Sequence, residues 1–306
     1  MPDPATNKAL FILNPNAGIP PLKFFVSEEL RRRRDELAYY KSLSVDESGN
    51  LIRNNFDKYN IFIAAGGDGT VHTIASRLAG TGKLLGVLPI GSGNGFAREL
   101  GFGPIIGTLL KDIERNESFD IDMITVNGEL CLNVAGVGLD SFVAHSFDKL
   151  GTRGFWSYVW VTIGNFIRLR PFQAEIHFDG GETIREDLFV LVAANTRQFG
   201  NYAFIAPDAA PNDGMLDIVM LKPFPKLLFP VIIFDLFTKR LGRSKYYRSV
   251  RTDREVTIRT VETRFQIDGE PVTLEGDVKI NIRKKALKVL KTRKNKFASV
   301  SVAEGT

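Results

Sequence analysis

The sequence has little of the chemistry that marks several common classes of protein. A single cysteine, Cys131, among 306 residues excludes an internal disulfide framework. The three histidines, at positions 72, 145 and 177, are scattered and form no HExxH or other metal-binding spacing, which argues against zinc chemistry. No apolar run reaches the roughly 18 residues of a membrane-spanning helix, and the first residues lack the apolar stretch of a signal peptide. We therefore expect a cytoplasmic protein.

Two well-known nucleotide motifs are also missing. The P-loop pattern GxxxxGK[ST] fails, because the pair Gly82-Lys83 has neither the preceding spacing nor a hydroxyl residue after it. The Rossmann pattern GxGxxG fails in "GSGNGF", where Phe96 stands in the place of the third glycine. A nucleotide site in this chain must therefore use another loop architecture.

The charge balance is basic, with a net charge of +5. The basic residues concentrate in two runs, 31–34 and 283–296. We interpret the first run as a solvated helix face, whereas the second could attract the chain transiently to an anionic membrane. The apolar segments 155–167 and 227–237 are more typical of core helices than of membrane contacts. We expect no nucleic-acid partner, and the oligomeric state stays open, a dimer included.

The pattern of apolar residues changes near residue 120, and the length of the chain favours two domains. Before that point, short apolar runs at 9–14, 60–65 and 84–90 read as buried strands, and residues 71–80 and 105–115 read as helices. Strands that alternate with helices predict a parallel α/β sheet. The first part of the chain is therefore expected to be an α/β domain.

After residue 120, runs of β-branched and alternating residues are joined by hairpin signals. The turns are expected at Asn127-Gly128 and at residues 179–181, and one helix is expected at about 155–169. This part should be mainly antiparallel β-structure. The predicted fold class is thus α/β, with an N-terminal nucleotide-binding domain on a parallel sheet and a C-terminal antiparallel, β-rich sandwich domain.

Each predicted N-terminal strand is followed directly by a small, glycine-containing loop. The loops are "NPNAG" at 14–18, "GGDGT" at 66–70 and "GSGNG" at 91–95. In a parallel sheet all three lie at the carboxyl edge, where ligands bind. One such loop could be a tight turn, but three in succession favour a phosphate cradle of backbone N–H groups. Because a bare carboxylate would repel phosphates, we expect Asp68 to act through Mg²⁺.

Five blocks of the sequence together resemble the diacylglycerol kinase and sphingosine kinase superfamily, and most of all its soluble bacterial lipid kinases. They are "GGDGT", "PIGSGNGFAREL", "LNVAGVGLDSFV", "IAPDAAPNDGMLDIVML" and "QIDGEP". The first alone is shared with NAD kinases and, more loosely, phosphofructokinases. The resemblance implies an ATP-binding domain of residues 1–121, with about 287–306 returning to it. It also implies a β-rich lipid-substrate domain of residues 122–286 and an active site in the cleft between the two.

The resemblance also implies roles for individual residues. Asp268 matches the general base and Glu270 a nearby acid, while Asp68 and Asp122 match the acids that hold catalytic Mg²⁺. The residues assigned to ATP are Asn14, Asn16, Gly66, Gly67, Gly69, Thr70, Gly91, Ser92, Gly93 and Asn94. A second, structural Mg²⁺ is implied at Asp213, with the main-chain carbonyls of Ala210 and Met215 as companions.

Three of these assignments also have a simpler structural interpretation. Asp122 could be a solvated carboxylate at a strand end, and Asp268-Gly269 could be an ordinary hairpin turn. Residues 212–214 could likewise be a simple turn that leads into the strand 215–221.

The chain departs from the family at Asn94-Gly95, where many members have an acid after the asparagine. This departure tilts the expected substrate towards a long-chain base or another amino-alcohol lipid. The predicted function is an ATP- and Mg²⁺-dependent lipid kinase that acts on diacylglycerol or a sphingoid lipid, peripheral to the membrane. The alternatives are an NAD kinase and a catalytically silent module that binds lipid or nucleotide.

Overall fold

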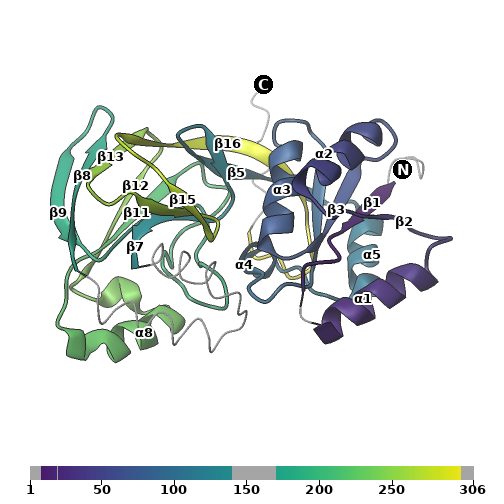
Figure 1. The fold of residues 1–306 in the computed structure, drawn as a ribbon, viewed down its shortest axis with the longest axis horizontal. Helices are drawn as coiled ribbons and strands as arrows, with labels where there is room; N and C mark the ends of the chain where they lie inside the picture. The colour runs from purple at the N-terminus through teal and green to yellow at the C-terminus, as the bar shows by residue number, and fades with distance from the viewer. Residues whose placement is uncertain (1–7, 19, 140–169, 298–306) are drawn as a thin grey trace, which may run out of the picture. The chain divides into compact units, whose positions relative to one another are not determined.

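The computed structural model describes residues 8–18, 20–139 and 170–297 (Figure 1). These residues divide into two compact units, which are described separately. Unit 1 comprises the chain up to Ile121 and from Lys285 onward, and unit 2 runs from Asp122 to Lys284. The helix predicted at about 155–169 lies outside the described residues.

Unit 1 is built on a parallel sheet with helices between its strands (Figure 1). The strand order is β2-β1-β3-β4-β16, and each of these neighbours pairs in parallel. The elements are β1 (Ala9–Leu13), α1 (Pro20–Arg32), β2 (Ala38–Lys41), α2 (Val45–Asn54), β3 (Ile61–Gly66), α3 (Asp68–Leu78), β4 (Leu84–Pro89), α4 (Gly95–Glu99) and α5 (Ile106–Arg115). The three strands and two helices predicted for this part of the chain are confirmed.

The strands of unit 1 form where the sequence is apolar without alternation. Every residue of β3 is buried, as expected of a central parallel strand that is covered on both faces. α2 was not predicted, and its Ser44 caps the helix by accepting the N–H of Glu47 at 3.1 Å. Arg31 and Arg32 end α1, where both side chains are exposed and pair with Glu28. The first basic run thus lies partly on a solvated helix face.

Unit 2 is an antiparallel structure of two sheets. One has the order β16-β13-β8-β9 with β5 and β6 attached, and the other has the order β12-β11-β10-β7-β14-β15. The elements are β5 (Ser118–Val126), β6 (Glu129–Cys131), β7 (Val134–Gly138), β8 (Phe172–Phe178), β9 (Thr183–Leu188), β10 (Val190–Ala194), β11 (Leu216–Leu221), η2 (Lys226–Leu228), α8 (Phe229–Phe237), η3 (Leu241–Arg243), β12 (Tyr247–Thr252), β13 (Val256–Thr260), β14 (Arg264–Ile267), β15 (Glu270–Thr273) and β16 (Val278–Leu290). The hairpins predicted at Asn127-Gly128 and at 179–181 are confirmed as the β5–β6 and β8–β9 pairs.

The core of unit 2 is an apolar layer to which strands of both sheets contribute. Ile176 and Val256 come from the first sheet, and Leu191 and Ile218 come from the second. In β8 buried residues alternate with more exposed ones, whereas β10 and β11 are buried at every position and supply a second apolar cluster with their other side. The packing of the two sheets gives the sandwich that the sequence predicted. β5 and β16 each continue along the chain from one unit into the other.

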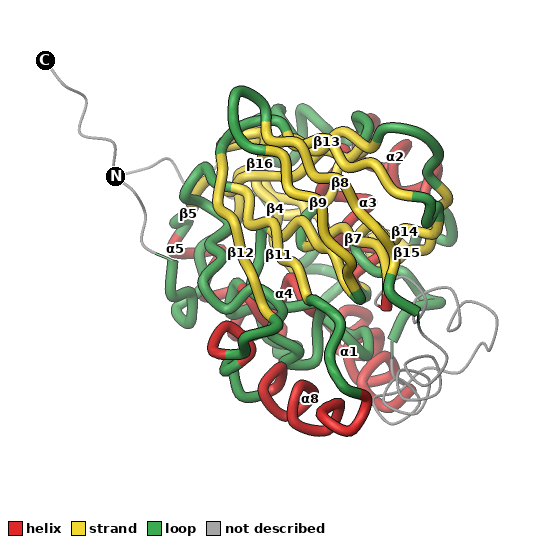
Figure 2. Tube along the Cα trace, turned by 90° about the vertical axis from the view of Figure 1, so that its left-hand side faces the viewer, coloured by secondary structure: helices red, strands yellow, loops and turns green. Residues whose placement is uncertain are grey.

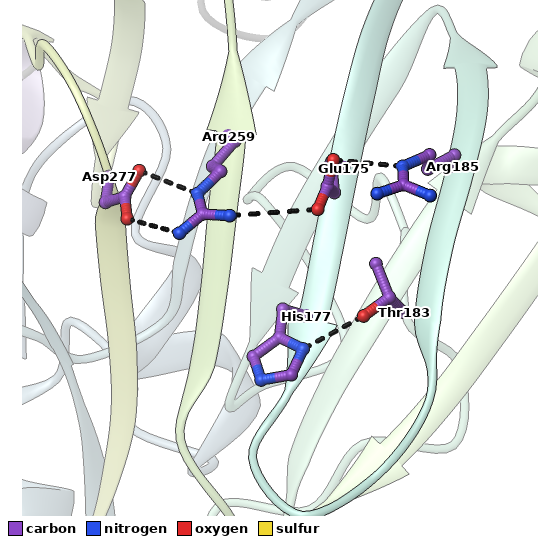
Figure 3. Close-up of polar contacts among 6 residues, drawn as sticks. All are labelled: Glu175, His177, Thr183, Arg185, Arg259 and Asp277. Carbon is purple, nitrogen blue, oxygen red and sulfur yellow. Dashed lines mark hydrogen bonds and ion pairs between the residues drawn. The ribbon is translucent and has the colours of Figure 1, made fainter.

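The outer face of the first sheet of unit 2 carries a ladder of ion pairs (Figure 3). Arg259 holds both oxygens of Asp277, at 2.9 and 3.0 Å, and its Nη1 lies 3.8 Å from Glu175. Glu175 is held in turn by Arg185 at 3.0 Å. The hydrogen bond from Arg259 lowers the pKa of Asp277, and that from Arg185 lowers the pKa of Glu175. This face is therefore polar and charge-paired.

α8 lies outside both sheets of unit 2 (Figure 2). Phe229 and Ile232 pack on the second sheet, in a cluster with residues of β10 and β11. The core helix predicted for 227–237 is therefore found on one face only, because Leu227, Val231 and Phe234 are exposed. Within 8–18, 20–139 and 170–297, every helix is too short or too polar to cross a bilayer.

Candidate functional site

In unit 1 the three predicted loops meet at the carboxyl ends of β1, β3 and β4. The side chain of Asn14 donates to the hydroxyl of Thr70 at 3.1 Å and accepts the N–H of Asn16 at 2.9 Å. A Cβ on Gly18 would lie 2.9 Å from the carbonyl oxygen of Ile90, so the first loop also touches the end of β4. Residues far apart in sequence thus form one continuous surface of backbone.

Two glycines of the loops are required by close contacts. A Cβ on Gly66 would clash with the side chain of Thr70 within the second loop. A Cβ on Gly91 would lie 2.6 Å from the Cα of Gly67, which is the residue that precedes α3. A side chain at Gly91 would therefore force the second and third loops apart, and one at Gly66 would displace Thr70, so the cradle depends on glycine itself.

Asp68 is the first residue of α3, and its carboxylate lies against the third loop. Its Oδ1 accepts the N–H of Phe96 at 3.4 Å, and a Cβ on Gly93 would lie 2.9 Å from its Oδ2. Asn94, in the left-handed conformation, donates its amide to the carbonyl of Gly91 at 2.7 Å. The Oδ1 of Asn94 is buried and has no hydrogen-bond partner among the described residues.

These features fit a phosphate and cation site. The N-terminus of an eleven-residue helix, α3, favours anions through its unpaired N–H groups. A carboxylate and an unpaired amide oxygen are the hard oxygen ligands that Mg²⁺ prefers. Sequence reasoning missed Arg98, whose Nε donates to the carbonyl of Gly93 at 3.0 Å and brings a positive charge to the loop. Gly69 and Ser92 are exposed on the same loops.

In unit 2, Asp268 occupies the turn of the β14–β15 hairpin. Its φ of 52° and that of Gly269, 87°, are the left-handed angles of a tight two-residue turn. The carboxylate reaches a neighbouring segment, where Oδ2 accepts the N–H of Leu132 at 2.8 Å and Oδ1 that of Asn133 at 2.7 Å. The hairpin interpretation is confirmed, and the role of Asp268 as general base stays a prediction that is compatible with it, because the turn itself positions the acid.

Cys131 and Glu270 complete the surroundings of Asp268. The thiol of Cys131 donates to Oδ1 of Asp268 at 3.3 Å. Burial, with the negative charge of Asp268, raises the pKa of Cys131 well above its ordinary value, so the thiol stays protonated and can donate. Glu270, at the start of β15, is exposed. Asp268 is thus oriented by three donors and only half-buried.

Asp122 is buried against the loop in which the second cation is predicted. Its Oδ2 accepts the N–H of Gly214 at 2.7 Å, and its own N–H donates to the carbonyl of Pro211 at 2.6 Å. Since Asp122 is only 2% exposed, the reading as a solvated carboxylate is wrong. Asn195, another residue that sequence reasoning missed, donates to the carbonyls of Asp122 and Leu132 at 2.8 and 2.9 Å.

Asp213 lies beside an arginine in this loop. Nη1 of Arg251 lies 3.6 Å from its Oδ2, while Oδ1 of Asp213 accepts the N–H of Met215 at 3.0 Å. Arg251 also donates to the carbonyl of Asp208 at 2.6 Å and lies 3.4 Å from the buried Asp217. The described residues contain no cluster of three His, Cys, Asp or Glu side chains that could hold a metal. The set of Asp213 with the carbonyls of Ala210 and Met215 stays a prediction, because it relies on main-chain oxygens.

Replacing Arg251 by methionine should destabilise unit 2, because it removes the cation beside Asp217. Burial raises the pKa of Asp217 and Arg251 opposes that rise, so the variant should raise this pKa further. A carboxyl group whose pKa is higher in the folded than in the unfolded protein favours folding only while it is protonated. That contribution is lost as the pH rises through the pKa of the folded state. We therefore expect a loss of about 1–3 kcal/mol in unfolding free energy near pH 7, shrinking as the solution is acidified.

Denaturant titrations carried out from neutral to acidic pH measure this loss. Arg259→Met is the matched control, because Arg259 is more exposed than Arg251 and its closest partner, Asp277, is exposed as well. Its loss should be much smaller than that of Arg251→Met at every pH, because an exposed ion pair contributes little to stability. Equal losses in the two variants, or an Arg251 deficit that grows on acidification, would contradict this account.

Comparisons with known proteins match both halves of the chain. Residues 8–126 match the diacylglycerol kinase catalytic domain, and residues 133–291 match the YegS C-terminal NAD kinase beta sandwich-like domain. A diacylglycerol kinase of Bacillus subtilis is 28% identical over 228 residues, covering 70% of this chain and 74% of that protein. A probable YegS-like lipid kinase of Pseudomonas fluorescens is 29% identical over 277 residues, covering 88% of each.

Solved structures show the same fold. A putative diacylglycerol kinase from Bacillus anthracis aligns with a TM-score of 0.75 at 22% identity, over 95% of this chain and 99% of that one. An NAD kinase from Archaeoglobus fulgidus, solved with ATP, aligns less well, with a TM-score of 0.53 at 14% identity over 94% of each chain. Proteins with this fold are thus named for different substrates, so the fold by itself does not identify the substrate.

Proposed function

Because the chain belongs to the family of diacylglycerol kinases and YegS-like lipid kinases, we propose that it transfers the γ-phosphoryl group of ATP to a lipid hydroxyl. The observation that carries this proposal is the convergence of three glycine loops on the N-terminus of α3. These loops lie in the part of the chain that matches a catalytic domain of phosphoryl transfer.

The loops of unit 1 bind the phosphates of ATP. The backbone approach of Gly67 and Gly91 leaves room for N–H groups to reach phosphate oxygens, and the α3 dipole adds a favourable potential. The guanidinium of Arg98 stands beside the same loop through its bond to Gly93. Asn14 and Thr70 hold the first and second loops together, so the cradle is formed before the nucleotide arrives.

The carboxylate of Asp68 and the amide oxygen of Asn94 would hold catalytic Mg²⁺, which supplies positive charge to the phosphates during transfer. Asp122 keeps its predicted place in this network as a proposal. Gly95, which replaces a family acid, is the first residue of α4, and the unpaired oxygen of Asn94 next to it offers an alternative ligand.

Asp268 of unit 2 accepts the proton of the lipid hydroxyl as its oxygen attacks the γ-phosphorus. The N–H groups of Leu132 and Asn133 fix the orientation of the carboxylate, so that it is held in place to accept the proton of the hydroxyl. Glu270 lies two residues further along the hairpin and adds negative charge at the exposed end. Positioning of the two reactants then contributes most of the rate.

The acceptor is a diacylglycerol or a sphingoid or other long-chain lipid. The match to diacylglycerol kinases favours the first, and the missing acid at Gly95 favours the second. Either lipid resides in a membrane, so the chain works peripherally, with transient attachment to an anionic surface. The basic run at 283–296 contributes less to that attachment than its sequence suggests, because Lys284 and Lys288 pair with Asp253 and Asp120.

An acceptor panel tests this proposal. Purified protein is incubated with ATP, Mg²⁺ and, separately, detergent-dispersed diacylglycerol, monoacylglycerol, sphingosine, ceramide, a crude lipid extract and NAD. Mass spectrometry should find a phosphorylated lipid, and the best acceptor sets the substrate class. Phosphorylated NAD alone would identify the chain as an NAD kinase and overturn the proposal of a lipid acceptor. ATP binding without any product would leave a silent binding module.

A further inference from the structure

α8 exposes an apolar face that no part of the described chain covers. Leu227, Val231 and Phe234 are 92%, 52% and 56% exposed, and they are the α8 patch. Their spacing of four and then three residues puts them on one side of the helical segment formed by η2 and α8. Phe229 and Ile232 face the other way, into the core cluster of unit 2. A helix that is apolar on both sides calls for a second apolar environment.

Basic residues flank the α8 patch in the sequence. Between residues 226 and 245 the only acid is Asp235. The same stretch carries five exposed cationic side chains, which we call the basic rim: Lys226, Lys239, Arg240, Arg243 and Lys245. An apolar face bordered by Lys and Arg is the composition of helices that lie in the interface of an anionic bilayer.

Two other occupants fit less well. A stable protein interface covers about 800 Å² and roughly 20–30 residues on each side, far more than three side chains offer. A second copy of the chain would also place two like-charged basic rims against each other, which disfavours association. The polar face of the first sheet in Figure 3 shows the contrast, since its charges of both signs pair with one another.

We propose that the α8 patch inserts into the headgroup region of an anionic membrane while the basic rim binds lipid phosphates. This docking rests on the proposed function, which requires access to a lipid in its bilayer. The exposed ring of Tyr202 adds an aromatic group nearby, because it contacts Phe204, whose N–H donates to Leu236 of α8 at 3.0 Å. Tyrosine is enriched at membrane interfaces for its apolar ring and polar tip.

Co-sedimentation of the full chain with vesicles tests the docking. Vesicles of phosphatidylcholine alone are compared with vesicles that also contain phosphatidylglycerol. The wild type should bind the anionic vesicles, and the binding should weaken with added salt. Val231→Ser with Phe234→Ser should lower the partition coefficient about tenfold or more. Arg240→Gln with Arg243→Gln should lower it about fivefold per charge on anionic vesicles alone.

Matched controls separate docking from general stickiness or misfolding. Val261 and Phe24 are 89% and 74% exposed and lie outside the α8 patch, so Val261→Ser with Phe24→Ser should bind as the wild type does. Thermal midpoints of all variants should stay equal, since the replaced side chains are exposed. Equal loss of binding in control and patch variants would overturn the proposal. A dimer of the wild type that the patch variant abolishes, with vesicle binding unchanged, would assign the surface to a second copy instead.

Activity measurements distinguish failure of the docking from failure of the proposed function. The patch variant should phosphorylate detergent-dispersed lipid at the wild-type rate and vesicle-embedded lipid at least tenfold more slowly, in line with its lower partition. Equal rates on both substrates would overturn the docking and leave the kinase function intact. Patch-dependent vesicle binding without any lipid phosphorylation would leave the docking intact and overturn the function.

Discussion

Replacing Asp268 by asparagine is expected to lower kcat for lipid phosphorylation about 10²–10⁴-fold, because an amide cannot accept the proton of the attacking hydroxyl. The loss should appear in kcat while KM for ATP changes little, since the nucleotide loops belong to the other unit. The variant should also unfold more easily. Its amide nitrogen would face the N–H of Leu132 or of Asn133, and one lost hydrogen bond costs about 1–3 kcal/mol.

A stability-matched control makes this result interpretable. The side chain of Gln266 accepts the N–H of Gly269 at 2.7 Å in the same hairpin. Gln266→Ala should therefore lower the thermal midpoint by a similar amount while leaving the Asp268 carboxylate in place, and turnover should largely survive. If the Asp268→Asn protein turned over as fast as the wild type, Asp268 would not be the base.

Replacing Gly91 by alanine is expected to weaken nucleotide binding sharply. The new Cβ would lie 2.6 Å from the Cα of Gly67 and 2.8 Å from Oδ1 of Asn94, so the second and third loops must separate. A displacement of about 1 Å in a positioned site costs about 100-fold. We expect kcat/KM for ATP to fall by about that factor, together with the affinity for ATP in calorimetry.

Gly103→Ala is the matched control for this variant. Gly103 lies in the same unit, has no atom within 4 Å of an added Cβ, and does not have a left-handed backbone. Its ATP affinity and kcat/KM should equal those of the wild type. Unchanged ATP affinity in Gly91→Ala would mean that these loops do not hold the phosphates.

The nucleotide loops could be predicted from the sequence because their signals are local. Apolar runs marked β1, β3 and β4, and each run ended in glycine and small polar residues. Parallel pairing then placed the three loops at one edge. The turn at Asp268-Gly269 was equally local, since an Asp-Gly pair between two strands favours the left-handed angles that the structure shows.

Contacts between distant segments could not be predicted in this way. Arg251 of β12 reaches Asp213, and Cys131 donates to Asp268 from 137 positions away in sequence. The spacing of these residues in the sequence does not predict the contacts, because only the packing of the strands brings the residues together. Arg98 was missed for a different reason, since an arginine on a short helix is typical of a solvated surface.

The exposed face of α8 could not be predicted from the composition of the segment. A segment that is apolar at nearly every position has no polar face, so its periodicity cannot distinguish buried from exposed sides. The sequence therefore predicted a core helix for 227–237, and only the packing of Phe229 and Ile232 reveals which side is covered.

The most direct test of the central claim follows the label of γ-³²P-ATP into the organic phase when purified protein is mixed with Mg²⁺ and dispersed lipid. The account predicts label in a chloroform-soluble product that increases with time and is nearly absent with Asp268→Asn. Label that stays in the aqueous phase with every lipid, from a folded protein that binds ATP, would contradict the assignment of this chain as a lipid kinase.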